Sequence, residues 1–112
     1  MQHVFKLPKE YTFQAVGIRG TNFETKELCD RTKFFVIETE TGHETRIREK
    51  ECDFNYYVLE GKGNFEIDCK VEKCQKGDMI IIPRGSVFKY TGKMKLFLIT
   101  DPYWRPEQEE TL

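Results

Sequence analysis

One histidine and two nearby arginines are the residues of this sequence most able to do chemistry in a pocket. His43 follows Gly42 in a segment typical of a loop, and imidazole is the usual side chain for proton transfer near neutral pH. Arg46 and Arg48 lie two residues apart, so on a strand both would point to one face and could bind a carboxylate or phosphate. Two ordinary alternatives remain open: an exposed His43, and a solvated arginine face among glutamates.

Two pairs of aromatic residues have the spacing that places them on one face of a strand. Phe54 and Tyr56 form the first pair, and Phe88 and Tyr90 form the second. If both pairs point into a barrel, they line a ligand pocket together with the arginines. They could equally close the core, because the interior of a small barrel is normally filled by side chains.

The four cysteines show no CxxC pair, which argues against a zinc site or a redox motif. They are Cys29, Cys52, Cys69 and Cys74, and we expect them to be free thiols in a reducing, cytoplasmic compartment. Cys52 lies close to Lys50 and is the best local candidate for a thiol activated by a neighbouring charge.

The elements that must position these residues are strands. Apolar and polar residues alternate, or cluster in short runs rich in Val, Ile, Phe and Tyr, and glycine-containing turns separate the runs. The pattern predicts an all-β protein with strands at Phe13 to Arg19, Lys33 to Glu40, Thr45 to Arg48, Phe54 to Leu59, Gly63 to Asp68, Met79 to Ile82, Val87 to Tyr90 and Lys95 to Thr100.

Two sequence blocks resemble the motifs of the cupin superfamily. In the segment Lys76 to Phe88, Gly77-Asp78 opens a turn, an apolar run ends at Pro83, and Gly85 follows, which is similar to the second cupin motif. The segment Tyr57 to Gly63 resembles the end of the first motif, at a separation typical of the family. The resemblance implies a double-stranded β-helix, or jelly-roll barrel, as the fold.

The same resemblance implies a metal site, but its ligands are missing. Metal-binding cupins carry a His-x-His pair, a Glu and a last His, whereas the corresponding residues here are Arg48 and Lys50 (or, one residue earlier, Ile47 and Glu49), then Phe54 and Phe88. A phenyl ring offers no ligand atom, and a cationic side chain repels a metal ion. We therefore expect no metal and no other cofactor.

Length and charge restrict the remaining possibilities. The chain of 112 residues predicts a single domain, 1–112, with an extended C-terminal tail at about 101–112 docked by Tyr103 and Trp104. Eighteen Lys and Arg against nineteen Asp and Glu give a net charge of −1, so we expect neither nucleic acid nor a membrane surface as a partner. No segment is typical of a leader or a membrane span.

Three functions are compatible with these features. The first is a metal-free binding module that holds a small organic ligand, anionic or sugar-like, in the barrel. The second is a metal-independent enzyme of the sugar epimerase or isomerase type, with His43 or a tyrosine hydroxyl at the floor of the pocket. The third is a structural protein with a filled barrel that only self-associates. We expect a homodimer in each case.

Overall fold

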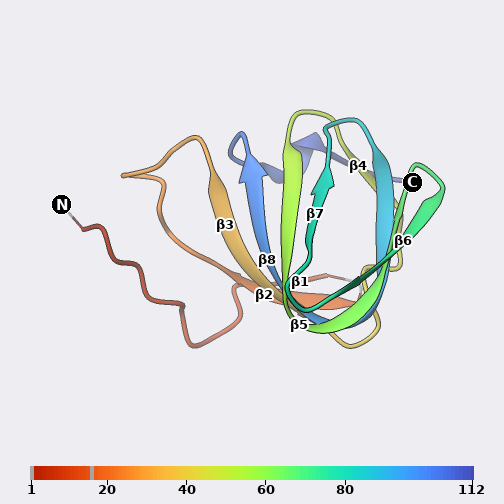
Figure 1. The fold of residues 1–112 in the computed structure, drawn as a ribbon. Coiled ribbons are helices and arrows are strands. Elements are labelled where there is room, and N and C mark those ends of the chain that lie inside the picture. Colours follow the sequence, from red (N-terminus) through yellow and green to blue (C-terminus); the bar gives the residue numbers. More distant parts are fainter. Residues whose placement is uncertain (1, 16) are drawn as a thin grey trace.

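The computed structural model describes residues 2–15 and 17–112, which fold almost entirely into β-strands (Figure 1). The elements are β1 (Phe13–Ala15), β2 (Ile18–Asn22), β3 (Lys33–Thr39), β4 (Ile47–Glu49), β5 (Asp53–Ile67), β6 (Lys70–Gln75), β7 (Met79–Ile82), β8 (Val87–Asp101), a 3₁₀ turn η1 (Pro106–Gln108) and β9 (Glu109–Thr111). The predicted all-β class is confirmed. None of the described residues forms a helix long and apolar enough to cross a membrane.

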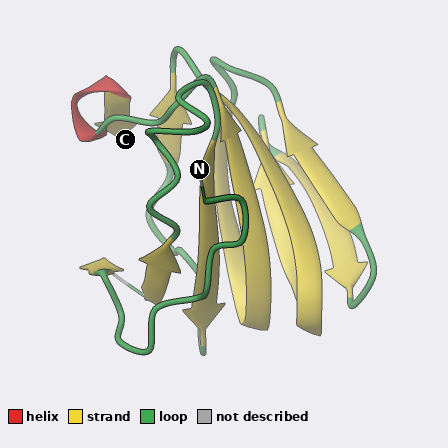
Figure 2. Cartoon of the chain, turned by 90° about the vertical axis from the view of Figure 1, so that its left-hand side faces the viewer, coloured by secondary structure: helices red, strands yellow, loops and turns green. Residues whose placement is uncertain are grey.

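Two long strands, β5 and β8, hold the fold together. They pair antiparallel along almost their whole length and curl, so that each contributes to two layers. In one layer, β3 pairs with the second half of β8 and β7 with the first half of β5. In the other, β4 pairs with the start of β8 and β6 with the second half of β5. Figure 2 shows the strands of the curled sheet from the side.

Glycines permit the curl where the two long strands bend together. Gly61 has a φ of +88° and Gly92 a φ of +120°, which is the left-handed region that other residues rarely adopt. A Cβ on Gly61 would collide with the carbonyl oxygen of Lys93, and one on Gly92 with the carbonyl oxygen of Lys62. Close backbone approach at this bend therefore requires glycine in both strands.

A β-bulge changes which residues of β5 point inward. Pairing with β8 shifts between Val58 and Glu60, so that Leu59 is an extra residue. Before the bulge, the buried residues are even-numbered, as in Tyr56 and Val58, whereas after it the buried residue is Phe65. One strand thus directs aromatic side chains to the core from both of its halves.

The strand pattern of the sequence predicted most of these elements. It predicted one strand where the structure has two, and two strands where the structure has one long strand. The segment predicted as one strand from Phe13 to Arg19 is a hairpin, because Gly17 adopts a φ of +81° between β1 and β2. Val16, within that prediction, lies outside the described residues. The strands predicted at Phe54 to Leu59 and Gly63 to Asp68 are one continuous strand, β5. Those predicted at Val87 to Tyr90 and Lys95 to Thr100 are likewise one strand, β8, because the pairing of β5 with β8 continues through the glycines.

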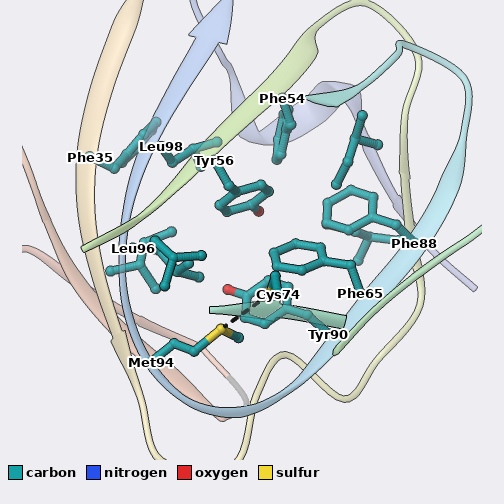
Figure 3. Packing of buried hydrophobic residues seen from close by; sticks show 14 of the residues in the cluster. Phe35, Phe54, Tyr56, Phe65, Cys74, Phe88, Tyr90, Met94, Leu96 and Leu98 are labelled. Carbon is teal, nitrogen blue, oxygen red and sulfur yellow. Dashed lines mark hydrogen bonds between the residues drawn. The ribbon is translucent and has the colours of Figure 1, made fainter. Parts of the chain in front are cut away.

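Aromatic rings fill the core between the two layers (Figure 3). Phe65 and Tyr90 have ring centroids 4.8 Å apart, and Tyr56 lies 5.2 Å from Phe65 and 5.6 Å from Tyr90. Phe88 packs 5.6 Å from Phe54. Edge-to-face and tilted contacts of this kind stabilise a core beyond their buried area. The cluster also makes a rigid wall for the cavity beside it.

Candidate active site

A cavity of about 380 Å³ lies on the inner side of the curled sheet, next to the aromatic core. Most of its lining is apolar, with a few polar side chains among the rings, which is the composition of small-molecule sites. The lining residues that carry polar groups include Thr12, Asn22, Lys33, His43, Tyr56, Tyr90, Trp104 and Glu109, and the rest include Phe13, Ile18, Phe35, Ile37, Ile47, Phe54 and Leu98.

His43 is held against β8 with its ring on the cavity. The backbone N–H of Tyr90 donates to the His43 carbonyl oxygen at 3.2 Å, and the two rings are 5.9 Å apart. Gly42 precedes it with a φ of +109°, and a Cβ there would collide with the Tyr90 carbonyl oxygen. This glycine therefore allows the loop to approach β8 closely enough to bring His43 to the cavity.

A hydrogen bond fixes the tautomer of the His43 ring. Nδ1 lies 2.8 Å from the carbonyl oxygen of Thr45. Since a carbonyl oxygen only accepts, Nδ1 carries the proton of the neutral ring and Nε2 keeps its lone pair. His43 is thus arranged as a proton acceptor.

Two buried tyrosines line the cavity together with this histidine. Tyr56 and Tyr90 are 2% and 1% exposed, and the hydroxyl of Tyr90 has no hydrogen-bond partner in the described structure. Burial raises the pKa of Tyr56 well above its ordinary value, with Tyr90 and Glu109 adding to the effect. Burial also raises the pKa of Tyr90, against a smaller lowering by the Tyr56 hydroxyl. Both hydroxyls therefore stay protonated and can donate to a ligand.

A carboxyl group completes the polar part of the cavity. Glu109 lines it from β9, where its register partner on β4 is Glu49. Burial raises the pKa of Glu109, and the nearby Glu49 raises it further. Glu49 itself is 2% exposed; its Oε1 accepts the backbone N–H groups of Glu51 and Cys52, and its Oε2 is buried without a partner.

Trp104 and Lys33 form another part of the lining. The Trp104 ring packs edge-on against Phe35, and its Nε1 is buried without a hydrogen-bond partner among the described residues. The Lys33 ammonium lies 5.3 Å from the centre of the Trp104 ring and 5.1 Å from that of Phe35. Burial lowers the pKa of Lys33, against a raising effect of Glu24. An unused N–H donor and a cation are therefore available to a ligand.

Known structures with the same strand arrangement identify the fold. Pac13 from Streptomyces, solved with uridine, matches with a TM-score of 0.90 at 19% identity, covering 100% of this chain and 92% of Pac13. The cupin domain of Schizosaccharomyces pombe Cnp3 matches 83% of this chain and 68% of its own, with a TM-score of 0.69 and 18% identity. This chain has the cupin fold. KdgF from Halomonas sp. is a further match, with a TM-score of 0.76, 13% identity and coverage of 95% and 98%.

Sequence comparison adds little to this structural likeness. No protein-family model matches this chain. Acireductone dioxygenase from Xenopus tropicalis is 37% identical over 62 residues, which cover 45% of this chain and 34% of that protein. The chain thus spans about a third of the length of this curated relative.

The motif positions that hold a metal in other cupins do not fit a metal ion in this one. Ile47 and Phe54 line the cavity and Phe88 is buried beside it, yet none of the three carries a ligand atom. In residues 2–15 and 17–112, no group of three or more His, Cys, Asp or Glu is placed to hold an ion. Loss of the cupin metal site stays a prediction, and we assign no chemical step to a metal.

The structure brings some of the predicted site residues together and separates others. His43, Phe54, Tyr56 and Tyr90 all line the cavity, whereas Phe88 packs behind it.

Arg46 and Arg48 lie outside this lining, because β4 buries the alternate residues Ile47 and Glu49. Arg46 pairs with Glu66 at 3.0 Å and Arg48 with Glu110 at 3.7 Å. Neither arginine is among the residues that we propose to contact the ligand.

The thiol considered as a nucleophile is poorly suited to that role. Cys52 is buried, and its Sγ lies 3.1 Å from the carbonyl oxygen of Pro102. Burial and the surrounding carboxylates, Glu49 first among them, raise the pKa of Cys52 to about 12. The thiolate is therefore scarce at neutral pH, which argues against Cys52 as a nucleophile.

Lys33, Trp104 and Glu109 are among the lining residues that the sequence analysis did not assign to the site. Glu109 and Trp104 belong to the tail, whose acidic and proline-rich composition is typical of surface. The tail instead includes η1 and β9, and β9 pairs with β4, about sixty residues earlier in the chain. The tryptophan in a charged segment was the one available signal, since a large ring among polar residues favours docking.

Proposed function

We propose that this cupin binds a nucleoside in its aromatic cavity and dehydrates it by acid–base catalysis, with His43 as the base. The observation that carries the proposal is the convergence of His43, Tyr56 and Tyr90 on one cavity, with Nε2 of His43 free to accept a proton. The apolar walls exclude water and strengthen hydrogen bonds from the two phenols.

The likeness to Pac13 supports the choice of a nucleoside. Pac13 is described as a nucleoside dehydratase, and its structures with uridine include one variant of a histidine and variants of two tyrosines. The numbers of those three positions in Pac13 are each one lower than those of His43, Tyr56 and Tyr90. At about 20% identity the fold alone is shared with certainty, so the activity of this chain is our proposal.

The proposed step removes one water without an oxidant or reductant. Nε2 of His43 takes a proton from a carbon, and the electron pair of that C–H bond forms a C=C bond. The neighbouring C–O bond breaks with its electron pair on oxygen, and a neutral acid of the cavity protonates that oxygen to give water. Tyr56 and Tyr90 remain protonated throughout and hold the substrate by hydrogen bonds.

Uridine binding measured by isothermal titration calorimetry tests the proposal. We expect saturable binding to the unmodified protein, and a roughly fivefold weaker affinity for Tyr56→Phe, because one buried hydrogen bond contributes about 1 kcal/mol. Tyr57→Phe is the matched control, because Tyr57 is the next residue of β5, points to the opposite face and is 40% exposed.

Mass spectrometry of nucleosides incubated with the protein then detects loss of water. Absence of uridine binding would contradict a nucleoside site. Binding of nucleosides without loss of water would instead support the simpler role of a small-molecule binding module.

We also propose a homodimer, formed through an outer apolar face of the sheet. On β3, β5, β7 and β8 many of the side chains that alternate with the core residues are apolar, and register pairing aligns them in rows across the four strands, with Asn55 as a polar residue among them. This outer apolar face comprises Phe34, Val36, Tyr57, Met79, Ile81, Phe97 and Ile99. Met79 and Ile81 are 62% and 60% exposed. A second copy is the occupant we favour, because a mostly apolar face is complementary to itself.

Light scattering coupled to gel filtration tests the dimer. We expect the unmodified protein to elute at twice the mass of one chain and Ile81→Lys to elute as a monomer, since an ammonium buried in the interface is costly. Val71→Lys places the same charge at a residue that is 61% exposed on β6 and should stay dimeric. A monomeric unmodified protein over a wide concentration range would exclude the dimer.

A cytoplasmic location is the remaining proposal. All four cysteines are free in the structure, which suits a reducing compartment. Cell fractionation that finds the protein in an oxidising compartment would contradict it.

A further inference from the structure

We propose that Glu109 is a further catalytic residue: a neutral carboxylic acid that donates a hydrogen bond to the bound nucleoside and then its proton to the departing hydroxyl group. The inference rests on the proposed dehydration and names the acid that the reaction needs.

The position of Glu109 is the first observation. Its side chain lines the same cavity as His43, Tyr56 and Tyr90. A negative charge on Glu109 raises the pKa of both tyrosines. Within the described residues, Glu109 takes part in none of the ion pairs, whereas the adjacent Glu110 pairs with Arg48 and Lys50 on the outside of β4. Glu109 is therefore a carboxyl group that lines a mostly apolar cavity and forms no ion pair with a described residue.

The environment of Glu49 is the second observation. Glu49 is buried at the register position opposite Glu109, and its Oε2 has no partner although the atom is inaccessible to solvent. Its other oxygen already accepts the backbone N–H groups of Glu51 and Cys52, which fix the carboxyl group in place. A carboxylate fixed in this way disfavours a second negative charge beside it.

The groups that face Glu109 therefore keep its proton in place. Glu49 faces it from β4, Tyr56 from β5 and Tyr90 from β8, and His43 and Lys33 line the same cavity. Burial raises the pKa of Glu109 and the charge of Glu49 raises it further.

The tyrosines are weaker candidates for the acid. Burial raises their pKa values from an ordinary 10, which makes proton transfer from either phenol harder at neutral pH. The pKa of Glu109 is raised from the much lower ordinary value of 4.5, so its acid form gives up a proton more readily than either phenol. In the balanced step, Glu109 ends as a carboxylate and His43 as an imidazolium, and a proton returned from His43 to Glu109 through solvent resets the site.

The ionisation of Glu109 can be measured without any ligand. Carbon-13 NMR of glutamate-labelled protein follows each carboxyl group through a pH titration, and Glu109→Gln assigns the signal by its disappearance. We expect Glu109 to titrate above an ordinary glutamate, and to titrate at lower pH in Glu49→Gln because the neighbouring negative charge is removed. The glutamine keeps an oxygen that accepts the N–H groups of Glu51 and Cys52, so this variant should fold.

Uridine binding and turnover test the role in the site. Affinity for uridine should fall as pH rises through the pKa of Glu109, because the carboxylate can no longer donate. This fall should move to lower pH in Glu49→Gln and vanish in Glu109→Gln, whose amide still donates at every pH. His43→Gln provides the background in which histidine titration cannot contribute. For any nucleoside that loses water, Glu109→Gln should lower kcat by about 100-fold or more while affinity changes less than threefold.

Two results would overturn the proposal. One is a Glu109 that titrates as an ordinary carboxyl group and does not respond to Glu49→Gln. The other is a Glu109→Gln variant with unchanged kcat and an unchanged pH dependence of binding. If the unmodified protein neither binds nor dehydrates nucleosides, the proposed function fails, and the NMR titration still decides whether Glu109 is a neutral acid.

Discussion

Replacing His43 by glutamine is expected to lower the rate constant of dehydration by about 10²- to 10⁴-fold, the usual contribution of a positioned base. Uridine affinity should change less than threefold, because the apolar walls and the two phenols remain. The amide of glutamine can still donate to the Thr45 carbonyl oxygen, as Nδ1 of His43 does, but it has no basic lone pair. Single-turnover kinetics at saturating nucleoside measure the effect on the chemical step.

The sequence offers a matched control for this substitution. His3 is the other histidine, and it is exposed near the start of the chain. His3→Gln should therefore leave both turnover and affinity unchanged. A His43→Gln variant that turns over at the normal rate would remove His43 from the mechanism.

Replacing Phe65 by alanine is expected to lower the free energy of unfolding by about 3–5 kcal/mol, the range for truncating a buried aromatic ring. Phe65 is fully buried, and its ring contacts those of both Tyr56 and Tyr90. The cavity left behind would also loosen both tyrosines, so uridine affinity should fall as well. Urea unfolding followed by circular dichroism gives the change in stability.

Val71→Ala is the control for this second experiment. Val71 lies on β6, which pairs with the same half of β5, but its side chain is 61% exposed. Its truncation should change stability by no more than about 0.5 kcal/mol. A Phe65→Ala protein as stable as Val71→Ala would show that the packing of Phe65 against Tyr56 and Tyr90 contributes little to the free energy of unfolding.

The motifs of the sequence were sufficient for the fold but not for the inner face of β4. Spacing by two places Arg46 and Arg48 on one face and Ile47 and Glu49 on the other, without telling which face is buried. Charge alone argues against burying Glu49. The structure buries it because the backbone N–H groups of Glu51 and Cys52 solvate one of its oxygens. Such local compensation depends on a turn geometry that residue types do not reveal.

The candidate site was predictable only where it depends on local sequence. The aromatic residues Phe54, Tyr56 and Tyr90 were placed in a pocket from alternation alone, and all three line the cavity. Glu109 reaches the cavity because β9 pairs with β4, a long-range contact that no local pattern in the tail predicts. Long-range pairing of short strands is therefore the step at which reasoning from the sequence stops.

The extra residue in β5 makes chain length itself a determinant of the site. Without Leu59, pairing with β8 would run in step along the whole strand, and one half of β5 would present its opposite face. Either Tyr57 would replace Tyr56 in the cavity, or Phe65 would leave the core. The number of residues between Tyr56 and Phe65, more than the identity of Leu59, therefore determines that both rings point inward, Tyr56 to the cavity and Phe65 to the core.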